Sequence, residues 1–506
     1  MRLLKSSEIS RVDKKTIEET GIPSLVLMEN AGRCAFEVIK ERFFDKDNFT
    51  VICGSGNNGG DGLVVSRYLY RYSKSVDVFI LSDSFDKLSQ DNRKNIEILR
   101  NFGLNPIFIT ADNLDILRES LLKADVIIDA IFGTGFKPPI SGYRTEVISL
   151  INQSGKRVIS IDIPSGLDAD SHKIYEPSIK ADITVTFGYK KPCHILYPAA
   201  EMCGEVVLCD IGLNDKYASD INRFIITPEN LIFPKREKTG HKYTFGHVAV
   251  IGGSVGKSGA VIMACKSASR SGSGLVTAII PDIINPVIET NLIEEMSYPV
   301  KSKDGFFDLD IPILDILKKL KISSVAVGMG MGVSEGCKDL LEKLITVEKP
   351  IVIDADGINN LVSINNWKEK LKSRDFPTVL TPHIGEFSRL TGYSSEQIFD
   401  NMEDIATQFC KDTGSYLIVK FSRMMVVTPE GKILYNITGN PGMATAGTGD
   451  ILAGIVASLI SRLPIEDALK LAVYTHGKAG DLASLKYGQE GLKATDLLEF
   501  INVEGP

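Results

Sequence analysis

The stretch NITGNPGMATAGTGDILA, from Asn436 to Ala453, is poor in bulky side chains and ends in Gly447-Thr448-Gly449-Asp450 before an apolar helical pattern begins. A glycine-rich turn that leads into a helix exposes backbone N–H groups and the positive end of the helix dipole, which together favour a phosphate. The negative charge of an aspartate would repel a phosphate that is bound there without reacting. Asp450 therefore suggests catalysis, as a base that takes a proton from a hydroxyl that attacks the phosphoryl group. The alternative is that Asp450 only caps the helix.

Length and composition narrow the class of protein. The 506 residues suggest two or more domains, and 43% hydrophobic with 24% charged residues is typical of globular proteins. A formal net charge of −7 gives no electrostatic reason to expect nucleic acid or an anionic membrane as a partner. No run resembles a signal peptide or a membrane span, and the eight cysteines have no zinc-binding spacing. We therefore expect a cytoplasmic protein with reduced, mostly buried thiols, and no nucleic acid or membrane partner.

The first half of the chain contains a second glycine-rich stretch. A strand pattern from Phe49 to Cys53 precedes the loop GSGNNGGDG, from Gly54 to Gly62, and an amphipathic helix pattern follows. Such a loop between strand and helix binds phosphate or a dinucleotide, although this one is not a Walker sequence, since no lysine follows. Because its paired asparagines and Asp61 add amide and carboxylate groups that a turn does not need, we predict a binding loop.

Two further strand patterns place an aspartate among apolar residues: Asp129 in ADVIIDAIFGTGF and Asp162 in RVISIDIPSGLDAD. A buried aspartate is costly unless it is paired, hydrogen-bonded or bound to a cation, and the carboxyl ends of parallel strands meet at one edge. Asn58, Asp129 and Ser165 would then offer oxygen ligands for an alkali or alkaline-earth cation. In the alternative, both aspartates only cap turns. His194, in YKKPCHILYPA, fits a structural hydrogen bond as well as it fits catalysis.

Asn57 to Gly62, the DAIFGTG and DIPSGLDAD strand ends and the KPCH segment resemble the NAD(P)H-hydrate epimerase domain. The resemblance implies a Rossmann-like fold, a bound potassium ion, and inversion of the hydroxyl-bearing carbon of a hydrated nicotinamide cofactor. It implies potassium ligands at Asn58, Asp129 and Ser165. We hypothesise that Asp162 is the acid/base, because the sequence places it best at a strand end. The substrate contacts that the resemblance implies are Asn57, Asn58, Gly59, Gly60, Asp61, Gly133, Thr134, Gly135, Phe136, Lys137, Pro138, Pro139 and Asp162.

The stretch from Asn222 to Tyr243 lacks periodicity and is rich in charge and proline. We therefore expect two domains, residues 1–222 and 223–506. From His247 onward, strand and helix patterns alternate up to the GTGD sequence, which indicates a second α/β domain.

Several polar residues of the second half follow strand patterns. Lys420 ends the apolar run LIVK, where it would either meet a nucleotide phosphate or lie in solvent. His383 is in the loop pattern TPHIGE, and Asp354 and Asp356 in VIDADG would organise a metal or cap turns. His476 fits helix packing.

GKSGA, VGMGMG, VIDADGIN, LTPHIGE, LIVK and NITGNPGMATAGTGD resemble the ADP-dependent NAD(P)H-hydrate dehydratases of the ribokinase-like superfamily. With the first-half motifs, nearly the whole chain resembles the fused NAD(P)H-hydrate repair enzymes. The implied nucleotide contacts are Lys420, Phe421, Ser422, Arg423, Met424 and Gly449, and the implied substrate contacts are Ala260, Gly330, His383 and Asp450. Met329, Ile384 and Ala446 stand where that family usually has proline, proline and glycine.

The resemblance implies epimerisation of (R)- and (S)-NAD(P)HX, and dehydration of the (S)-form to NAD(P)H with ADP or ATP and magnesium. AMP or ADP and phosphate are released. Asp450 would be the base while the substrate hydroxyl attacks the terminal phosphoryl group, and the helix start would stabilise the transferred charge. We also expect a homo-oligomer, a tetramer or larger. Alternatives of other kinds are a vitamin or sugar kinase with an N-terminal nucleotide-binding regulatory domain, and a nucleotide-binding sensor without catalysis.

Overall fold

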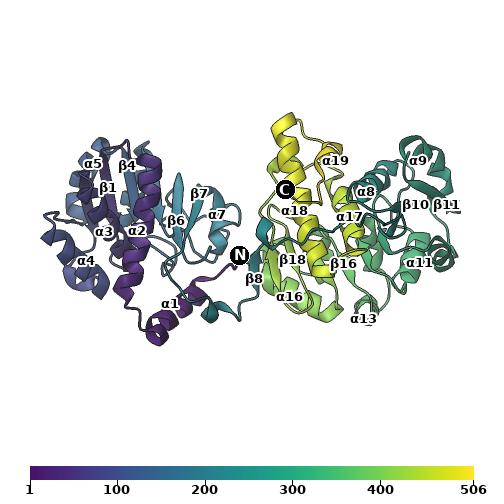
Figure 1. The fold of residues 1–506 in the computed structure, drawn as a ribbon, viewed down its shortest axis with the longest axis horizontal. Coiled ribbons are helices and arrows are strands. Elements are labelled where there is room, and N and C mark those ends of the chain that lie inside the picture. The colour runs from purple at the N-terminus through teal and green to yellow at the C-terminus, as the bar shows by residue number, and fades with distance from the viewer. Residues whose placement is uncertain (506) are drawn as a thin grey trace. The chain divides into compact units, whose positions relative to one another are not determined.

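The structure is a computed structural model that describes residues 1–505. The chain divides into two compact units: Arg2–Ile221, and Met1 together with the chain from Asn222 onward. Each unit is an α/β domain built on a largely parallel sheet (Figure 1). Among the described residues, no helix combines the length and the apolar character that crossing a bilayer requires.

In the described part of the amino-terminal unit, seven strands form a sheet in the order β3-β2-β1-β4-β5-β6-β7, and every neighbouring pair is parallel. The strands are Asn48–Cys53 (β1), Ser75–Leu81 (β2), Ile107–Ile109 (β3), Val126–Ala130 (β4), Arg157–Ile161 (β5), Ile183–Phe187 (β6) and Glu205–Cys209 (β7). The order doubles back between β1 and β4. In such sheets, ligands bind beyond the carboxyl ends of the strands at this switch point.

Helices cover both faces of this sheet, because successive strand residues face opposite sides. Val51 and Cys53 of β1 pack in one cluster with α2, α3 and α4, whereas Ile52 packs in another with α5 and α6. The helices of the unit are Ser6–Thr20 (α1), Ser24–Phe43 (α2), Asn57–Arg71 (α3), Gln90–Asn101 (α4), Leu114–Lys123 (α5), Tyr143–Gln153 (α6) and Ala199–Met202 (α7). The unit therefore has the three layers expected of a Rossmann-like fold.

The predicted glycine loop up to Gly62 is shorter than expected, because α3 begins at Asn57 and includes the asparagine and glycine residues. A Cβ on Gly59 would lie 2.0 Å from the carbonyl oxygen of Gly54, so only glycine allows this close approach. Asn92 of α4 holds the short loop that remains, since its side-chain amide donates to the Gly54 carbonyl at 2.9 Å. The predicted loop was therefore too long. From Asn57 onward the residues belong to α3, and the glycines there allow close packing at the start of the helix.

Two cysteines contradict the prediction of reduced thiols. Cys34 of α2 and Cys209 of β7 form a disulfide, although 175 residues separate them in the sequence. Within residues 1–505 the other six cysteines are free and buried. The prediction was wrong for this pair because α2 packs beside β7, a contact that no cysteine spacing reveals.

In the described part of the carboxy-terminal unit, ten strands form one sheet in the order β11-β10-β9-β14-β15-β16-β17-β18-β19-β8. The pairs from β11 to β17 are parallel, β18 is antiparallel to both neighbours, and β8 is parallel to β19. The strands are Arg223–Ile225 (β8), His247–Ile251 (β9), Leu275–Pro281 (β10), Met296–Val300 (β11), Ser324–Val327 (β14), Ile351–Ile353 (β15), Thr378–Leu380 (β16), Tyr416–Val419 (β17), Met425–Val427 (β18) and Ile433–Tyr435 (β19). Ser302–Lys303 (β12) and Phe306–Phe307 (β13) pair separately. The switch point of the large sheet lies between β9 and β14.

Part of the stretch predicted as a linker is a strand. Within Asn222 to Tyr243, β8 pairs with β19, with Arg223 opposite Ile433 and Ile225 opposite Tyr435. A three-residue strand is too short to show an alternating pattern, so the sequence did not reveal it.

Helix α17 carries the GTGD sequence at its start and packs against α8 and α18. From Ile451 to Ile460 every residue is buried, so the helix is apolar on all sides. A Cβ on Gly454 would lie 2.1 Å from the Ser267 hydroxyl and 2.2 Å from the Ala264 carbonyl oxygen of α8, so glycine allows the close contact of the two helices. The helices of this unit are Ser258–Arg270 (α8), Asn285–Asn291 (α9), Ile313–Leu320 (α10), Glu335–Leu344 (α11), Asp356–Leu361 (α12), Trp367–Lys372 (α13), Ile384–Thr391 (α14), Ser395–Asp400 (α15), Met402–Thr413 (α16), Thr448–Ile460 (α17), Ile465–Tyr487 (α18) and Leu497–Phe500 (α19).

Candidate active sites

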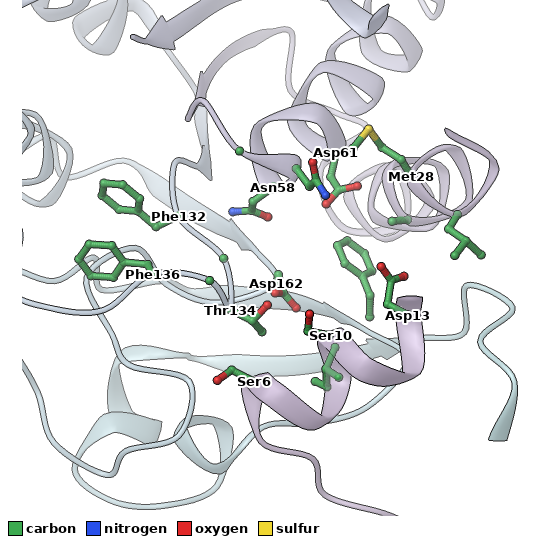
Figure 2. A pocket seen from close by; sticks show the side chains of 18 of the residues that line it. Ser6, Ser10, Asp13, Met28, Asn58, Asp61, Phe132, Thr134, Phe136 and Asp162 are labelled. Atoms are coloured by element: carbon green, nitrogen blue, oxygen red, sulfur yellow. The ribbon is translucent and has the colours of Figure 1, made fainter. Parts of the chain in front are cut away.

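A cavity of about 800 Å³ lies at the switch point of the amino-terminal sheet (Figure 2). Its walls come from α1, the start of α3, the loop after β4 and the turn after β5. The predicted residues that line it are Asn57, Asn58, Asp61, Gly133, Thr134, Gly135, Phe136, Lys137 and Asp162. Among the described residues, the predicted contacts Gly59, Gly60, Pro138 and Pro139 lie outside this lining. Phe136 stacks on Phe132 with ring centres 4.4 Å apart, which gives the loop after β4 an apolar face.

Asp162 follows β5 with a backbone φ of +67°, a conformation that costs energy for a residue other than glycine. Its carboxylate Oδ1 accepts hydrogen bonds from Lys191 Nζ at 2.6 Å and from the Thr186 hydroxyl at 3.1 Å. Burial would raise the pKa of Asp162, but the charge and hydrogen bond of Lys191 outweigh it and hold the pKa below its ordinary value. Asp162 is therefore ionised at neutral pH and can accept a proton.

Lys191 is the cation that pairs with Asp162, and it was not predicted. It is 1% exposed, and its ammonium group also donates to the Thr186 hydroxyl at 2.6 Å and to the Phe187 carbonyl at 3.3 Å. A buried charge persists only when it is paired and hydrogen-bonded, and Lys191 meets both conditions through Asp162.

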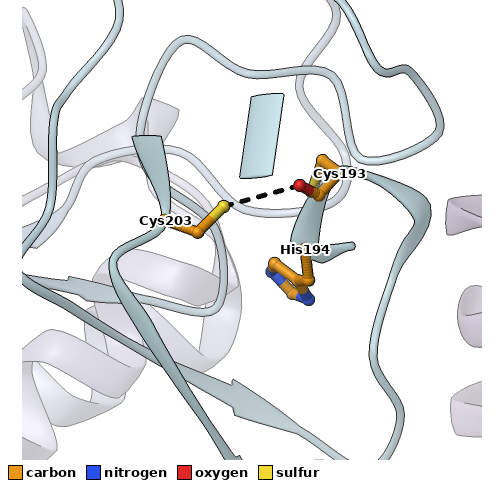
Figure 3. A group of neighbouring side chains, drawn as sticks. All are labelled: Cys193, His194 and Cys203. Carbon is orange, nitrogen blue, oxygen red and sulfur yellow. Dashed lines mark hydrogen bonds between the residues drawn. The ribbon is translucent and has the colours of Figure 1, made fainter. Parts of the chain in front are cut away.

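His194 lies in a buried group with Cys193 and Cys203, whose possible ligand atoms are all within 4.8 Å of one another (Figure 3). Both imidazole nitrogens are engaged elsewhere. Nδ1 accepts from the Lys191 N–H at 3.1 Å, and Nε2 lies 3.0 Å from the Asp162 carbonyl oxygen, to which it donates. The Cys203 thiol donates to the Cys193 carbonyl at 3.6 Å. We therefore interpret His194 as a structural residue that holds Asp162 and Lys191 in place. Of the two roles that the sequence left open for His194, the structural hydrogen bond fits these contacts.

Asp61 of α3, Asp13 of α1 and Asp162, which follows β5, line the cavity from different elements (Figure 2). The pKa of Asp61 is well above its ordinary value because the group is desolvated and lies in the field of Asp162 and Asp13, against a smaller effect of Lys191. The pKa of Asp13 is raised by burial and by Asp91. Among the carboxyl groups that line the cavity, burial and neighbouring carboxylates therefore raise the pKa of Asp61 and Asp13, whereas Lys191 lowers that of Asp162.

The predicted cation ligands lie at and beneath one wall of this cavity. Asp129 is fully buried, and its hydrogen bonds come from neutral groups: the Ser160 hydroxyl at 2.8 Å, the Ser165 hydroxyl at 2.5 Å, and the N–H groups of Ser165 at 2.9 Å and Ile131 at 3.2 Å. Burial raises the pKa of Asp129, although these hydrogen bonds lower it. Both polar atoms of the Asn58 amide are buried without a hydrogen-bond partner. An unpartnered amide oxygen and a carboxylate with no cation beside it suit a hard cation.

The second site lies where α17 begins. Asp450 is in the first turn of this helix and is half-buried, so its carboxylate is not turned into the core. A Cβ on Gly449 would lie 3.2 Å from Lys420 Nζ and 3.7 Å from Asp354 Oδ2. The helix start, the lysine after β17 and the aspartate after β15 therefore meet at one point.

Lys420 and Asp354 form an ion pair at this point, with Nζ 2.6 Å from Oδ1 and Asp354 1% exposed. The pKa of Asp450 is raised to about 7, by burial most of all and then by the charge of Asp354, while the charge of Lys420 acts in the opposite direction. Burial also raises the pKa of Glu386 on α14, which lies in the field of the same lysine and aspartate. Asp450 is therefore partly protonated near neutral pH, as suits a group that exchanges a proton.

The other predicted substrate contacts are His383, Gly330 and Ala260. His383 forms an isolated parallel β-bridge with Lys420. Its side chain caps α14, because Nδ1 accepts a hydrogen bond from the Gly385 N–H at 3.0 Å. A Cβ on Gly330 would lie 3.0 Å from the Cβ of Ala260, so these two predicted contacts are neighbours.

The predicted nucleotide contacts at residues 421–424 form the turn between β17 and β18. The Arg423 guanidinium donates to the Ile437 carbonyl, and the Met424 carbonyl accepts from the Asn436 N–H at 2.8 Å. The turn is thereby tied to the glycine-rich stretch that leads to α17.

Helix α18 supports that stretch through two side chains. His476 is 2% exposed, and its Nε2 donates to the Thr448 carbonyl at 2.9 Å. Burial lowers the pKa of His476 to about 4, so the ring is neutral. Asp481 accepts from the Gly439 N–H at 3.0 Å and from the Asn440 side chain at 3.1 Å. Both residues hold the conformation of the stretch.

Known families match both units. Residues 24–193 match the family described as YjeF-related protein N-terminus, and residues 248–502 match the family described as NAD(P)H-hydrate dehydratase.

Relatives match over nearly the full length. The bifunctional NAD(P)H-hydrate repair enzyme Nnr of Moorella thermoacetica is 37% identical over 515 residues, which cover 99% of this chain and 96% of the relative. The protein of the same name from Escherichia coli (strain K12) is 30% identical over 498 residues, which cover 97% of this chain and 92% of the relative. The chain belongs to the family of bifunctional NAD(P)H-hydrate repair enzymes.

The carboxy-terminal part of this repair enzyme also aligns with a solved structure, the ADP/ATP-dependent NAD(P)H-hydrate dehydratase from Bacillus subtilis co-crystallized with ATP and Mg²⁺. The alignment covers 55% of this chain and 95% of that chain, with 25% identity and a TM-score of 0.48.

Sequence reasoning missed several polar residues of the repair-enzyme sites. The residues are Asp13, Thr186, Lys191, Glu386 and Asp481. Lys191 and Glu386 carried a signal, because they belong to the KPCH and LTPHIGE segments on which the resemblance rests. The others lie in ordinary strand or helix patterns, and only the packing of distant segments brings them to the sites.

Proposed function

We propose that each unit catalyses one step of the repair of hydrated nicotinamide cofactors. The amino-terminal unit interconverts (R)- and (S)-NAD(P)HX, and the carboxy-terminal unit dehydrates the (S)-form to NAD(P)H with ADP or ATP as phosphoryl donor. Family membership supports the pair of activities. The observation that carries the dehydratase assignment is a carboxylate with a pKa of about 7 in the first turn of a helix that follows a glycine-rich turn.

Asp450 is the proposed base of the dehydratase. It takes the proton of the substrate hydroxyl while that oxygen attacks the terminal phosphoryl group, and the N–H groups at the start of α17 stabilise the charge that spreads over the phosphoryl oxygens. Phosphate then leaves with the former hydroxyl oxygen, pushed by the lone pair of the ring nitrogen. Loss of a neighbouring proton restores the dihydropyridine.

The nucleotide is proposed to lie beside Gly449, in contact with Lys420 and residues 421–424, and to bring magnesium with its phosphates. Magnesium in such sites is held by one or two carboxylates in addition to phosphate oxygens. Asp354 Oδ2 faces Gly449 and is not the oxygen that binds Lys420, so it and Asp450 are the proposed carboxylate contacts. The ion would neutralise charge on the transferred group.

Asp162 is the proposed base of the epimerase. The pairing of its Oδ1 with Lys191 keeps it ionised, and it lines the cavity with the predicted substrate contacts. Potassium is proposed to bind Asn58, Asp129 and Ser165, where an amide oxygen lacks a partner and a buried carboxylate lacks a cation. A bound ion would supply positive charge beneath the substrate ring.

Substitution of Asp450 by asparagine tests the dehydratase proposal. Asparagine keeps the shape but cannot accept the proton, so we expect the rate of NADH formation from (S)-NADHX and ADP to fall about 100- to 10,000-fold. Asp404→Asn, an exposed aspartate of α16, is the matched control and should leave the rate unchanged. An unchanged rate in Asp450→Asn would remove the assignment, and a phosphorylated substrate as the final product would favour the kinase alternative.

The choice between ADP and ATP, the cytoplasmic location and the homo-oligomeric state stay predictions. Each rests on the resemblance or on composition.

A further inference from the structure

We propose that Asp61 is the second proton-transfer residue of the epimerase: it gives a proton to the leaving atom of the hydrated ring while Asp162 takes one. The inference rests on the proposed epimerase function of the cavity and adds a catalytic role to a residue expected only to contact substrate. It follows from the placement of two carboxyl groups with opposite environments on different walls of one cavity.

The two carboxyl groups belong to different elements. Asp61 lies in α3, the helix after β1, and Asp162 lies after β5, and Figure 2 shows both side chains pointing into the cavity. Asp162 is bound to the Lys191 ammonium group at 2.6 Å, which keeps it ionised. Burial raises the pKa of Asp61 most, and the charges of Asp162 and Asp13 raise it further, so its surroundings disfavour the ionised form. The cavity thus offers an acid and a base at the same pH.

Either route of inversion needs such a pair. If water is lost, Asp61 gives its proton to the departing hydroxyl while the nitrogen lone pair forms a double bond to the carbon. A water molecule then adds to the other face, and Asp162 takes its proton. If the ring opens, Asp162 takes the hydroxyl proton as the carbon–nitrogen bond breaks, and Asp61 gives its proton to the nitrogen. The resulting aldehyde rotates, and reclosure reverses both transfers. The first route leaves Asp61 ionised and Asp162 protonated. Asp162 then loses its proton to solvent and Asp61 takes one from solvent, which restores both groups.

Asp13 is the other carboxyl group of the cavity whose pKa is raised, but it is the weaker candidate. Besides burial, the pKa of Asp13 is raised by the charge of Asp91. Besides burial, the largest effect on the pKa of Asp61 is the charge of Asp162. Proton delivery by Asp61 is therefore coupled directly to the charge on the base, because protonation of Asp162 removes the field that keeps Asp61 neutral.

The test uses the full-length protein and measures conversion of (R)- to (S)-NADHX by chiral separation, after subtraction of the spontaneous rate. Asp61→Asn keeps shape and hydrogen bonding but has no proton to give as an acid, so we expect kcat to fall about 100-fold or more while KM stays near the wild-type value. Asp61→Glu keeps an acid and should retain more activity than Asp61→Asn. The matched control is Asp112→Asn, an exposed aspartate of the same unit.

The pH profile of the wild-type protein gives a second readout that needs no variant. The rate should fall on the alkaline side as Asp61 loses its proton, and Asp61→Asn should lack this limb. The titratable groups that face Asp61 are Asp13 of α1, Cys53 of β1, Asp162 and Lys191, and none of these four is proposed to give the proton to the leaving atom.

A kcat of Asp61→Asn close to that of the wild-type protein would overturn the inference, as would a larger loss in Asp13→Asn than in Asp61→Asn. The proposed function fails separately: a wild-type protein that converts the epimers no faster than the spontaneous rate has no epimerase to assign.

Discussion

Asp450 and Asp162 follow the same sequence logic, an aspartate at an edge where ligands bind, yet their surroundings give them opposite proton affinities. Asp162 is bound directly to Lys191, which lowers its pKa in spite of burial. Asp450 shares Lys420 with Asp354, and burial together with the charge of Asp354 raises its pKa to about 7. The difference is therefore the number of carboxylates that surround each lysine. Sequence placed the aspartates but could not count the charges around them.

The pKa of Asp450 predicts the pH dependence of the dehydratase. A base works only when deprotonated, so kcat/KM for (S)-NADHX should rise with pH through an apparent pKa near about 7. Asp354→Asn removes the neighbouring charge that raises this value, so the rise should move to lower pH. The measurement is kcat/KM against pH for both proteins. A rise that stays in place or moves to higher pH in Asp354→Asn would contradict the assignment.

Lys191 predicts the behaviour of the epimerase. In Lys191→Met the charge that offsets burial is gone, so the pKa of Asp162 should rise and the acid limb of epimerisation should move to higher pH. Removal of one partner of a buried ion pair should also lower the free energy of unfolding of this unit by about 3–5 kcal/mol. Epimerase pH profiles and denaturant unfolding measure the two effects, and an unshifted acid limb would show that Lys191 does not control Asp162.

At the scale of elements, the sites are made by helix starts and strand ends whose positions depend on close packing. Strand patterns and the order of motifs in the sequence were enough to predict two α/β domains with ligands at the carboxyl edges. The start of α3 at Asn57, the short strand β8 and the disulfide between α2 and β7 were not predictable, because each depends on contacts between distant segments. The residues that support the GTGD turn from α18 were hidden for the same reason.

Two glycines in contacting helices test the packing of α17. In Gly454→Ala the new Cβ would meet α8 at 2.1 Å, so we expect the free energy of unfolding to fall by about 1–3 kcal/mol. Gly259 of α8 has no atom within 4 Å of such a Cβ. Gly259→Ala is therefore the matched control, and helix propensity predicts a gain of about 0.5–1 kcal/mol. Equal effects of the two substitutions in denaturant unfolding would argue against the close contact.

The disulfide between Cys34 and Cys209 is tested by counting thiols. The denatured, unreduced protein should take up a maleimide label at six cysteines, and the reduced protein at all eight. Because the bond closes a loop of 175 residues, Cys34→Ala combined with Cys209→Ala should cost about 2–4 kcal/mol of stability. Labelling of eight cysteines before reduction would favour the original prediction of reduced thiols.

For the whole molecule, two sites on one chain account for repair of both epimers. A dehydratase that accepts only the (S)-form leaves the (R)-form unrepaired, and an epimerase on the same chain makes it available. The motif order across both units carried this conclusion from the sequence alone, and relatives that cover 99% of the chain show the same family. What the sequence could not reveal is how the charges of Lys191, Asp354 and Glu386 are arranged around the two aspartates, on which the proton transfers depend.

The most direct measurement follows recovery of NADH from a mixture of (R)- and (S)-NADHX with ADP, for the wild-type protein and for two single variants. The wild-type protein should convert the whole mixture. Asp162→Asn should convert the (S)-form at the normal rate and the rest only as fast as the epimers interconvert spontaneously, and Asp450→Asn should recover almost no NADH. Recovery by Asp450→Asn at the wild-type rate would contradict the account.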